Sequence, residues 1–455
     1  MTVELAKHWR SVLPHLSEQL PPDLTPRSAS GTPVHVNLPL ELVRQSVSQR
    51  EYWPIPDEVL DAYRRFRPTP LWRATGFERA IGARVPVYVK YEGGNISGSH
   101  KLNTALAQAY YYQRAGVREL VTGTGAGQWG TALAAACALF GLRCTVFMVG
   151  SSLRRKPYRG VLMRMLGAQV HASPTGLTEV GAHHDGSGNS LSLAIGEAVE
   201  YAAGRDGVAF AIGSGETYSI LHQSVIGIES MAQLAEVDAD VDAVVGCVGA
   251  GSNFGGIALP FHAEAAATGS RPPLLVAAES STTPKLTRGV YAYDHTDATG
   301  SGPMEAMYTI GSDYSIPDSH SAGLRFHGAA KVISAMRHRG EVAATAVGQV
   351  DALEAGRLFT VHETVLPAPE SGHALAAAAR LATTGTSDES GYRAERGVLV
   401  CVSGHGYLDL AAYQQLLDGE LSDEAPREAE LLRAVSGLAE VGTSRPAPVM
   451  AGRSS

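Results

Sequence analysis

Short β-branched runs alternate with longer helical stretches along most of the chain. The strands predicted from these runs cover 85–92, 119–124, 143–150, 169–174, 242–249, 273–280 and 396–406. The predicted helices cover 101–116, 130–141, 157–168 and 219–236. Because strands separated by helices usually pair in parallel, this rhythm predicts an α/β fold with two doubly wound parallel-sheet domains. We expect the active site to lie between the two domains.

The same pattern divides the chain into four segments. Residues 1–57 are proline-rich and irregular, and are interpreted as an extension packed over the body. We predict an N-terminal α/β domain over 58–230 and a C-terminal α/β domain over 231–418. A helix and a disordered tail are predicted for 419–455. The polar stretches that interrupt the rhythm, interpreted as a mobile loop and a lid, are 174–192 and 281–327.

Composition narrows the class of function. The chain has 455 residues and a formal net charge of −8, which argues against binding to nucleic acid or to an anionic membrane surface. No apolar run approaches the length of a membrane span, and the N-terminal residues lack the apolar centre of a signal peptide. The four cysteines are isolated and form no CxxC pair, so buried free thiols are expected. These features predict a cytoplasmic enzyme.

Two glycine-rich loops each join a predicted strand to a helix. The first, Gly125-x-Gly127-x-x-Gly130, matches the dinucleotide fingerprint, but no acidic residue that could bind a ribose occurs between Glu119 and Glu179. Backbone N–H groups at a helix N-terminus bind a carboxylate as readily as a phosphate. The second loop, 249–253, adds hydroxyl and amide donors and suits a phosphate better. Either loop alone could equally be a close strand-to-helix turn.

Lys101 is one of only six lysines and opens an apolar helix after a Ser/Gly turn. That end of a helix disfavours a second positive charge, so a lysine there is an unusual choice. A lysine whose ammonium is disfavoured forms Schiff bases readily. A solvated surface lysine is the alternative that these residues leave open.

Several motifs together resemble the tryptophan synthase β-subunit family. They are SGSHKLN at 97–103, TGAGQWG at 124–130, GAGSN at 249–253 and SGHG at 403–406, in the family's order. The details KPYRGVLM, LHQSVIG and GLRFHG are similar to the second type of that family. The resemblance covers roughly residues 40–415, and implies the fold-type-II architecture with pyridoxal phosphate as cofactor. It also leaves room for a monovalent cation, and no other metal is expected.

The resemblance assigns roles residue by residue. It implies that Lys101 holds pyridoxal phosphate as a Schiff base and exchanges the α-proton of the substrate, and that Ser403 lies beside the pyridine nitrogen. The other expected cofactor contacts are His100, Asn103, Gly249, Ala250, Gly251, Ser252, Asn253 and Glu363. The expected contacts of the substrate α-carboxylate are Thr124, Gly125, Ala126, Gly127 and Gln128.

The implied reaction is a β-replacement. L-Serine or a related β-substituted amino acid would lose its β-group to give an aminoacrylate, which adds a nucleophile. Three alternatives stay open: synthesis of L-tryptophan from L-serine and indole with a relocated acid–base group, β-elimination by a serine or threonine dehydratase, and a non-catalytic protein that binds pyridoxal phosphate.

Departures from the family's pattern set the expected specificity. Gly123 stands where the family carries its acid–base glutamate, which puts ordinary tryptophan synthesis in doubt. Glycine there would also leave space for a bulkier substrate or a water. We hypothesise that Glu216 or Tyr218 supplies the relocated acid–base group. The alternative is that Glu216 is a loop carboxylate that faces the solvent. Arg325 is expected either to bind an acidic leaving group or to form an ion pair that closes the lid. A homodimer without an α-subunit is expected.

Overall fold

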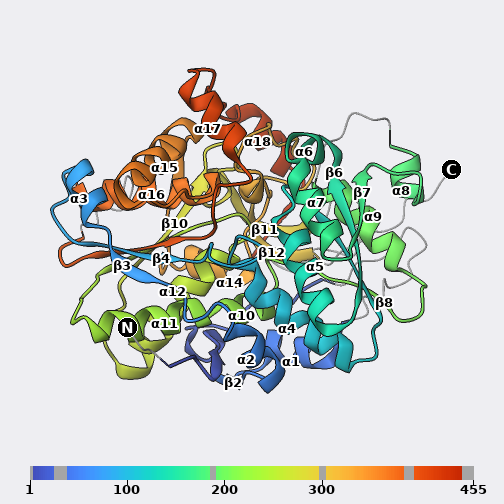
Figure 1. Ribbon diagram of the computed structural model, residues 1–455, viewed down its shortest axis with the longest axis horizontal. Helices are drawn as coiled ribbons and strands as arrows, with labels where there is room; N and C mark the ends of the chain where they lie inside the picture. The colour runs from blue at the N-terminus through green and yellow to red at the C-terminus, as the bar shows by residue number, and fades with distance from the viewer. Residues whose placement is uncertain (1–3, 25–37, 185–190, 297–303, 384–393, 443–455) are drawn as a thin grey trace.

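The computed structural model describes residues 4–24, 38–184, 191–296, 304–383 and 394–442. Two β-sheets form the centre of this part of the chain (Figure 1). The larger sheet has the strand order β13-β10-β9-β14-β4-β3, and its neighbours pair in parallel except β3 with β4. Its strands are β3 (Leu71–Arg73), β4 (Val87–Tyr91), β9 (Ala243–Cys247), β10 (Leu274–Ser280), β13 (Ala343–Val347) and β14 (Val398–Val402).

The smaller sheet is parallel throughout, in the order β7-β6-β5-β8. Its strands are β5 (Glu119–Thr124), β6 (Arg143–Val149), β7 (Gln169–Ser173) and β8 (Val208–Phe210). Strand β5 is buried along its whole length because helices cover both faces of the sheet. On one face Val121 and Phe147 pack against Ala194 and Ala198 of helix α9 (Leu191–Ala202).

Helices surround both sheets (Figure 1). In the first half of the chain they are α1 (Leu40–Val47), α2 (Asp57–Tyr63), α3 (Thr75–Ile81), α4 (Lys101–Arg114), α5 (Gln128–Phe140), α6 (Gly150–Arg155), α7 (Pro157–Met165), α8 (Glu179–Ala182), α10 (Thr217–Gln223) and α11 (Val225–Glu236). In the second half they are α12 (Ser252–Thr268), α13 (Lys285–Arg288), α14 (Lys331–His338), α15 (Gln349–Glu363), α16 (Pro369–Thr383), α17 (Leu410–Leu417) and α18 (Glu428–Val435), with the 3-10 turns η1 (Leu13–His15) and η2 (Ala322–Leu324).

Two small antiparallel sheets complete the fold. Strand β1 (His8–Arg10) pairs with β2 (Tyr52–Pro54), which ties the N-terminal segment together. Strand β11 (Val290–His295) lies between β12 (Met304–Thr309) and β15 (Ala439–Glu440). The N-terminal segment is packed over the body as predicted, because Trp9 and Leu42 are fully buried in the main hydrophobic core.

The α/β architecture with two parallel-rich sheets confirms the predicted fold class. The sheets do not follow the predicted boundary at residue 230, however, because β3 and β4 belong to the larger sheet beside β14. The alternation of strands and helices identifies each strand but not the strand with which it pairs. The predicted grouping of β4 with the smaller sheet is therefore wrong. The smaller sheet takes its strands from 119–210 alone.

Two of the irregular stretches contain regular structure. The predicted lid over 281–327 carries α13, strands β11 and β12 and the turn η2, so it is a small antiparallel unit with a connection rather than one long loop. Within the predicted mobile loop, α8 is helical, whereas 185–190 lie outside the described residues. Part of the predicted C-terminal tail, 443–455, also lies outside them; the described part forms α18 and β15.

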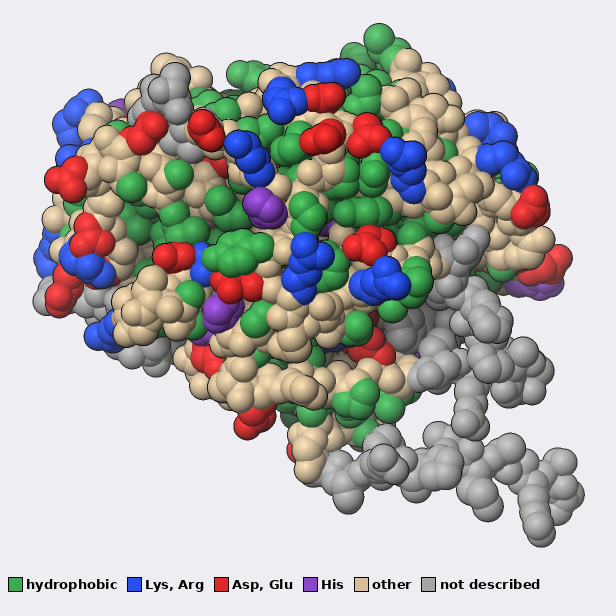
Figure 2. All heavy atoms as spheres, turned by 90° about the horizontal axis from the view of Figure 1, so that it is seen from below, with side chains coloured by type: hydrophobic (Ala, Val, Ile, Leu, Met, Phe, Trp, Pro, Cys, Tyr) green, Lys and Arg blue, Asp and Glu red, His purple; other side chains and the backbone are tan. Residues whose placement is uncertain are grey.

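The surface carries mixed charge. Figure 2 shows the face that holds α1, α2 and β2, where Lys and Arg side chains alternate with Asp and Glu around scattered hydrophobic groups. The exposed hydrophobic side chains of α1 are Leu40, Val43 and Val47. No helix among the described residues is both long and apolar enough to cross a membrane.

Candidate active site

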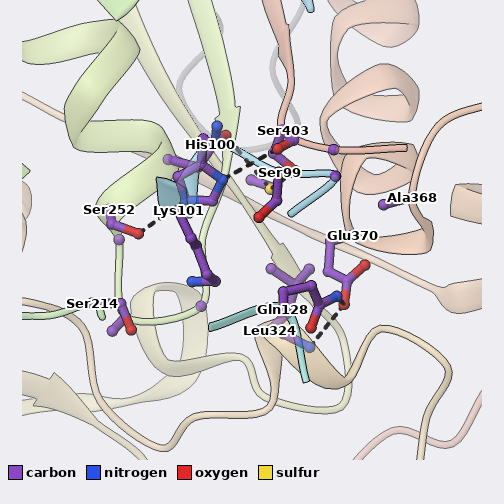
Figure 3. Close-up of a pocket in the computed structure, with 18 of the residues that line it drawn as sticks. Ser99, His100, Lys101, Gln128, Ser214, Ser252, Leu324, Ala368, Glu370 and Ser403 are labelled. Carbon is purple, nitrogen blue, oxygen red and sulfur yellow. Dashed lines mark hydrogen bonds between the residues drawn. The ribbon is translucent and has the colours of Figure 1, made fainter. Parts of the chain in front are cut away.

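A cavity with an empty volume of about 510 Å³ lies where the two sheets meet (Figure 3). The turns that follow β9 and β14 reach it from the larger sheet, and the N-termini of α4, α12 and α16 also open onto it. Ligands of open α/β sheets bind beyond the carboxyl ends of the strands, so this position suits a cofactor. Three of its walls come from 98–101, 249–253 and 403–405.

Lys101 is the first residue of α4, and its side chain extends into this cavity (Figure 3). Among the described residues no acceptor lies within hydrogen-bonding distance of its ammonium group. Burial lowers the pKa of Lys101, and the nearby Cys247 and Glu370 oppose that shift only in part. A larger share of neutral amine is therefore available to attack an aldehyde.

His100 joins two walls of the cavity. Its Nδ1 lies 3.2 Å from the carbonyl oxygen of Ser403, and its Nε2 lies 3.1 Å from Oγ of Ser252. Burial, with a contribution from Lys101, lowers the pKa of His100 to about 3. The imidazole is therefore neutral near pH 7 and links β14 to the start of α12.

Residues 249–253 form a cup at the N-terminus of α12, a helix of 17 residues. Gly251 adopts a φ of 128°, and a Cβ there would lie 2.2 Å from Cδ1 of Ile333, so both backbone conformation and space require glycine. Backbone N–H groups and the helix dipole at such a terminus favour an anion. The hydroxyl of Ser252 adds a side-chain donor on the same wall.

Ser403 lines the cavity just beyond β14. Its Oγ is 2.9 Å from Oγ of Ser371, and the thiol of Cys247 lies 3.5 Å away. Burial raises the pKa of Cys247 to about 11, so the thiol stays protonated near pH 7. The groups around this hydroxyl are therefore neutral.

A second cavity, with an empty volume of about 590 Å³, adjoins the first. The two share Lys101, Gln128, Ser214, Ala250 and Gly323. One wall of the second cavity is formed by residues 123–126 and Gln128, where β5 ends and α5 begins. The other walls are mostly apolar: Trp129, Leu191, Ile195, Ile212 and Phe326.

Packing fixes the indole ring of Trp129 as a wall of this second cavity. Its Nε1 donates to Oγ1 of Thr122 at 2.7 Å. Gly213 lies so close that a Cβ there would be 2.1 Å from the ring. The ring is therefore held both by a hydrogen bond and by backbone contact.

The comparisons with known proteins agree with this geometry. Residues 63–404 match the family described as "Pyridoxal-phosphate dependent enzyme". The tryptophan synthase beta chain of Pyrobaculum islandicum is 48% identical over 398 residues, covering 86% of this chain and 92% of the relative. That of Thermococcus onnurineus is 41% identical over 441 residues, covering 94% and 98%, and the beta chain 2 of Thermococcus kodakarensis is 42% identical over 431 residues, covering 93% and 96%.

The chain belongs to the tryptophan synthase β family of pyridoxal-phosphate-dependent enzymes. Solved structures agree on the fold. An L-serine ammonia-lyase from Rhizomucor miehei has a TM-score of 0.58 at 18% identity, covering 78% of this chain and 98% of that one. Threonine deaminase isoform 2 of Solanum lycopersicum also has a TM-score of 0.58, at 16% identity, covering 89% and 99%. The protein is thus a fold-type-II lyase with pyridoxal phosphate as its cofactor.

The cavity fits the cofactor of this tryptophan synthase β family. The cup at 249–253 offers an anion site for the phosphate, and Lys101 offers an amine for the aldehyde. Ser403 offers a neutral hydroxyl. Among the described residues no group of three or more His, Cys, Asp or Glu side chains could hold a metal ion, and all four cysteines are buried and free.

Gln128 and Glu370 connect the two cavities of this family member. Nε2 of Gln128 donates to Oε1 of Glu370 at 3.0 Å, and the backbone N–H of Gly323 donates to the same oxygen at 2.9 Å (Figure 3). The motif reasoning missed Glu370, although it is the first acidic residue of α16 and stands within the motif LPAPESGH. The turn η2, which carries Gly323, is thereby linked through Glu370 to Gln128 at the start of α5.

Most residues predicted to bind the cofactor or the substrate line the two cavities. His100, Lys101, Ser403 and the whole of 249–253 line the first, and Thr124, Gly125, Ala126 and Gln128 line the second. Gly127 does not line either cavity; its φ of 93° shapes the turn instead. These residues lie at the cavities, and their contacts with the cofactor and the substrate remain predictions.

Two predicted cofactor contacts lie elsewhere. Asn103 lies on α4 with its side chain buried, and it accepts from Arg67 at 2.8 Å and donates to Gln223 at 2.9 Å. Two residues along a helix correspond to about 200° of rotation, which turns Asn103 away from Lys101. Glu363 accepts from the backbone N–H of Phe77 at 2.8 Å and from the indole of Trp72 at 2.9 Å, outside the cavity. The carboxylate that faces the cavity is Glu370, not Glu363.

The predicted relocated acid–base group is also wrong in position. Neither Glu216 nor Tyr218 lines either cavity. Burial raises the pKa of Glu216, and the groups whose charges act on it are Lys331 and Asp23. Tyr218 is buried within α10, where its ring packs near His222. Tyr218 belongs to the main hydrophobic core, and α10 packs against α12, α4 and α1.

Arg325 forms an ion pair instead of facing the substrate. It donates to Asp318 at 2.6 Å and to the carbonyl oxygen of Ile316 at 2.9 Å, and it does not line either cavity. Asp318 also pairs with Arg155 of α6 at 2.5 Å. Of the two expected roles for Arg325, the structure therefore supports the ion pair that ties the predicted lid to the smaller sheet's side.

Gly123 lines the second cavity with its backbone, but a side chain at this position would be directed into α9. A Cβ at this position would lie 2.6 Å from the backbone carbon of Ala194 and from the nitrogen of Ile195 in α9. The space expected beside Gly123 is therefore present in the second cavity, but it does not lie in the direction that a side chain would take. Helix α9 itself occupies the direction in which a side chain would project from β5.

Proposed function

We propose that the enzyme replaces the β-substituent of L-serine, or of a related β-substituted amino acid, by a neutral apolar nucleophile. The observation that carries this proposal is the second cavity of about 590 Å³, which adjoins the first and shares Lys101 with it. A simple elimination needs room only for the amino acid. A replacement also needs a place for the second reactant, and a mostly apolar compartment suits an uncharged one.

The chain's own residues divide the work. Pyridoxal phosphate, when bound, supplies the electron sink for reactions at the α- and β-carbons. The turn at 124–128 would hold the substrate's α-carboxylate at the N-terminus of α5. Lys101 would take the α-proton and return it, because its ammonium is disfavoured by burial and its side chain reaches both cavities.

The groups around Ser403 favour loss of the β-substituent. A hydroxyl bonded to Ser371 and near a protonated thiol carries no negative charge. A carboxylate beside the pyridine nitrogen would stabilise its protonated form, and a hydroxyl does not. The weaker electron sink favours prompt departure of a leaving group over a long-lived carbanion at the α-carbon.

The lining of the second cavity bears on the identity of the nucleophile. Among the described residues that line the second cavity, Lys101 is the only charged side chain. An indole ring would find no carboxylate from position 123, so we favour a nucleophile with its own reactivity, such as an apolar thiol. Tryptophan synthesis from L-serine and indole is the second candidate, because relatives named for it are 40–48% identical to this chain.

The test is a product assay with L-serine. The holoenzyme is incubated alone, with indole, and with an aromatic thiol, and pyruvate and new amino acids are measured by mass spectrometry. We expect the S-substituted amino acid with the thiol and little tryptophan with indole. Tryptophan as the main product would support the second candidate instead. Pyruvate alone in all three mixtures would contradict replacement and identify a dehydratase.

The Lys101→Ala variant is the control for that assay. It should lose the Schiff-base absorbance of bound pyridoxal phosphate as well as turnover.

We also propose that the enzyme acts as a cytoplasmic homodimer without an α-subunit or a nucleic-acid or membrane partner, a prediction that rests on the family resemblance. The mass of the holoenzyme in solution, compared with 47.8 kDa for one chain, tests the dimer.

A further inference from the structure

Glu370 is the single carboxylate among the described residues that line the two cavities. It lies in the first turn of α16 and is 95% buried, with a relative exposure of 5%. Its Oε1 accepts two hydrogen bonds, from Gln128 and from the backbone of Gly323. Its Oε2 is buried and has no hydrogen-bond partner in the described part of the chain. A buried carboxyl oxygen without a partner can accept one more hydrogen bond, or donate one when protonated.

The carboxyl is held at the boundary between the two cavities. Gln128 and Gly323 line both cavities, and each donates to Oε1 of Glu370. Glu370 is also close enough to Lys101 for its charge to act on that lysine. It is therefore near both the amine that handles the α-proton and the compartment that would admit a nucleophile.

The other titratable groups that line the cavities are engaged or poorly matched to proton exchange. Both ring nitrogens of His100 have partners. Burial raises the pKa of Cys247 to about 11. Nδ1 of His405 accepts from the backbone of Tyr407 at 3.2 Å, and its Nε2 lies 2.3 Å from where a Cβ of Gly98 would be. Apart from Lys101, the groups with hydrogen-bonding capacity left among the described residues are His405 and Glu370, and of these two Glu370 is the one held by residues that line both cavities.

We infer that Glu370 is a catalytic residue that exchanges protons with the groups leaving and entering at the β-carbon, a role that rests on the proposed function. The Glu370 carboxyl first takes up a proton from solvent. When Lys101 has taken the α-proton, the electron pair of that C–H bond expels the β-hydroxyl, which takes the proton of Glu370 and leaves as water. The Glu370 carboxylate then takes the proton of the nucleophile as its bond to the β-carbon forms. Lys101 returns the α-proton. One nucleophile is consumed and one water is released.

The test compares two leaving groups in the Glu370→Gln variant. Glutamine keeps the size of the side chain and an oxygen that can accept from Gln128 and Gly323, but it cannot exchange the proton. Hydroxide leaves L-serine only with a proton, whereas chloride leaves β-chloro-L-alanine without one. We expect kcat/KM for L-serine to fall on the order of 10²–10⁴-fold, and that for β-chloro-L-alanine by less than about 10-fold. The sum of S-substituted amino acid and pyruvate formed in the presence of the aromatic thiol measures both.

Two further measurements separate catalysis from structure. The affinity of the apoprotein for pyridoxal phosphate and the midpoint of thermal unfolding should match those of the wild type. Glu354→Gln is the matched control, since Glu354 is half-exposed on the neighbouring α15 and pairs with Arg357. It should leave both substrates and the cofactor affinity unchanged.

Each outcome decides the role. An equal loss for both substrates, unchanged rates for both, or weaker binding of pyridoxal phosphate would overturn the assignment of Glu370 alone. A wild-type enzyme that converts neither substrate, with or without the aromatic thiol, would overturn the proposed function, and this role with it. A selective loss for L-serine with normal cofactor affinity supports both.

Discussion

At Gly123 the backbone of α9 comes within 2.6 Å of the Cβ position, so no side chain fits while that helix keeps its place. Restoring the family's glutamate by Gly123→Glu should therefore displace α9 rather than create an acid–base group. We expect the free energy of unfolding to fall by about 1–3 kcal/mol, as for other overpacked sites, with no gain of tryptophan synthesis. Denaturant unfolding and the indole assay measure the two effects.

Gly125→Ala is the matched control for that variant. It lies in the same turn, but its Cβ would meet its nearest neighbour, the carbonyl oxygen of Ala322, at an ordinary 3.7 Å. Its unfolding should therefore stay close to that of the wild type. A Gly123→Glu protein as stable as the wild type, or one that makes tryptophan, would show that α9 yields easily and that the glycine is not a structural requirement.

Beneath α4, a buried network of charges joins elements that are distant in sequence. Arg67 pairs with Glu92 at the end of β4 at 2.9 Å and with Glu229 of α11 at 2.8 Å. Lys90 of β4 pairs with the same Glu229 at 2.9 Å. All four side chains are fully buried, and Asn103 of α4 also bonds to Arg67. The network therefore fixes the position of α4, the helix that begins with Lys101.

Removing one member should leave the others uncompensated. Glu229→Ala would strip Arg67 and Lys90 of a shared partner in a buried site, and we expect it to lower the free energy of unfolding by about 3–5 kcal/mol. Glu236→Ala, at the exposed end of the same α11, should change it by less than about 0.5 kcal/mol. Denaturant titrations of the three holoenzymes make the comparison. Equal effects would mean that the network adds nothing to stability.

The elements show which parts of the structure could be predicted. The predicted strand 119–124 coincides with β5, because an apolar run bounded by glycines and buried on both faces is a strong local signal. The predicted helix 219–236 divides at Ser224 into α10 and α11. Local patterns do not specify which strands pair, so the place of β4 in the larger sheet could not be predicted.

The site residues divide in the same way. The cup at 249–253 and the turn at 124–128 could be predicted because glycine loops before a helix place their own backbone N–H groups. Glu363 and Glu370 stand seven residues apart, and sequence alone could not show which of them faces the cavity. Thr364, with a φ of 59°, ends α15 and turns the chain, so that the second carboxylate rather than the first reaches the site.

Across the whole molecule, buried neutral histidines should make stability fall in mild acid. Burial lowers the pKa of His222 to about 3, and that of His100 to about 3 as well. In the unfolded chain a histidine takes up its proton near pH 6.5. Between these values the unfolded state binds more protons, so the free energy of unfolding decreases as the pH falls. Buried carboxyls whose pKa is raised, such as Glu279 and Glu305, act in the opposite direction above pH 4.5.

A variant at His222 isolates one term of this balance. His222 does not line either cavity; its nitrogens lie 3.0 Å from Oγ1 of Thr104 and 2.9 Å from Oε1 of Gln45. His222→Gln removes the titration while keeping hydrogen-bonding atoms, so the slope of unfolding free energy against pH between about 6 and 4.5 should flatten by up to about 1.4 kcal/mol per pH unit. Carboxylates with lowered pKa, such as Glu92, contribute only below that range. Parallel slopes for the two holoenzymes would show that His222 is protonated in the folded protein.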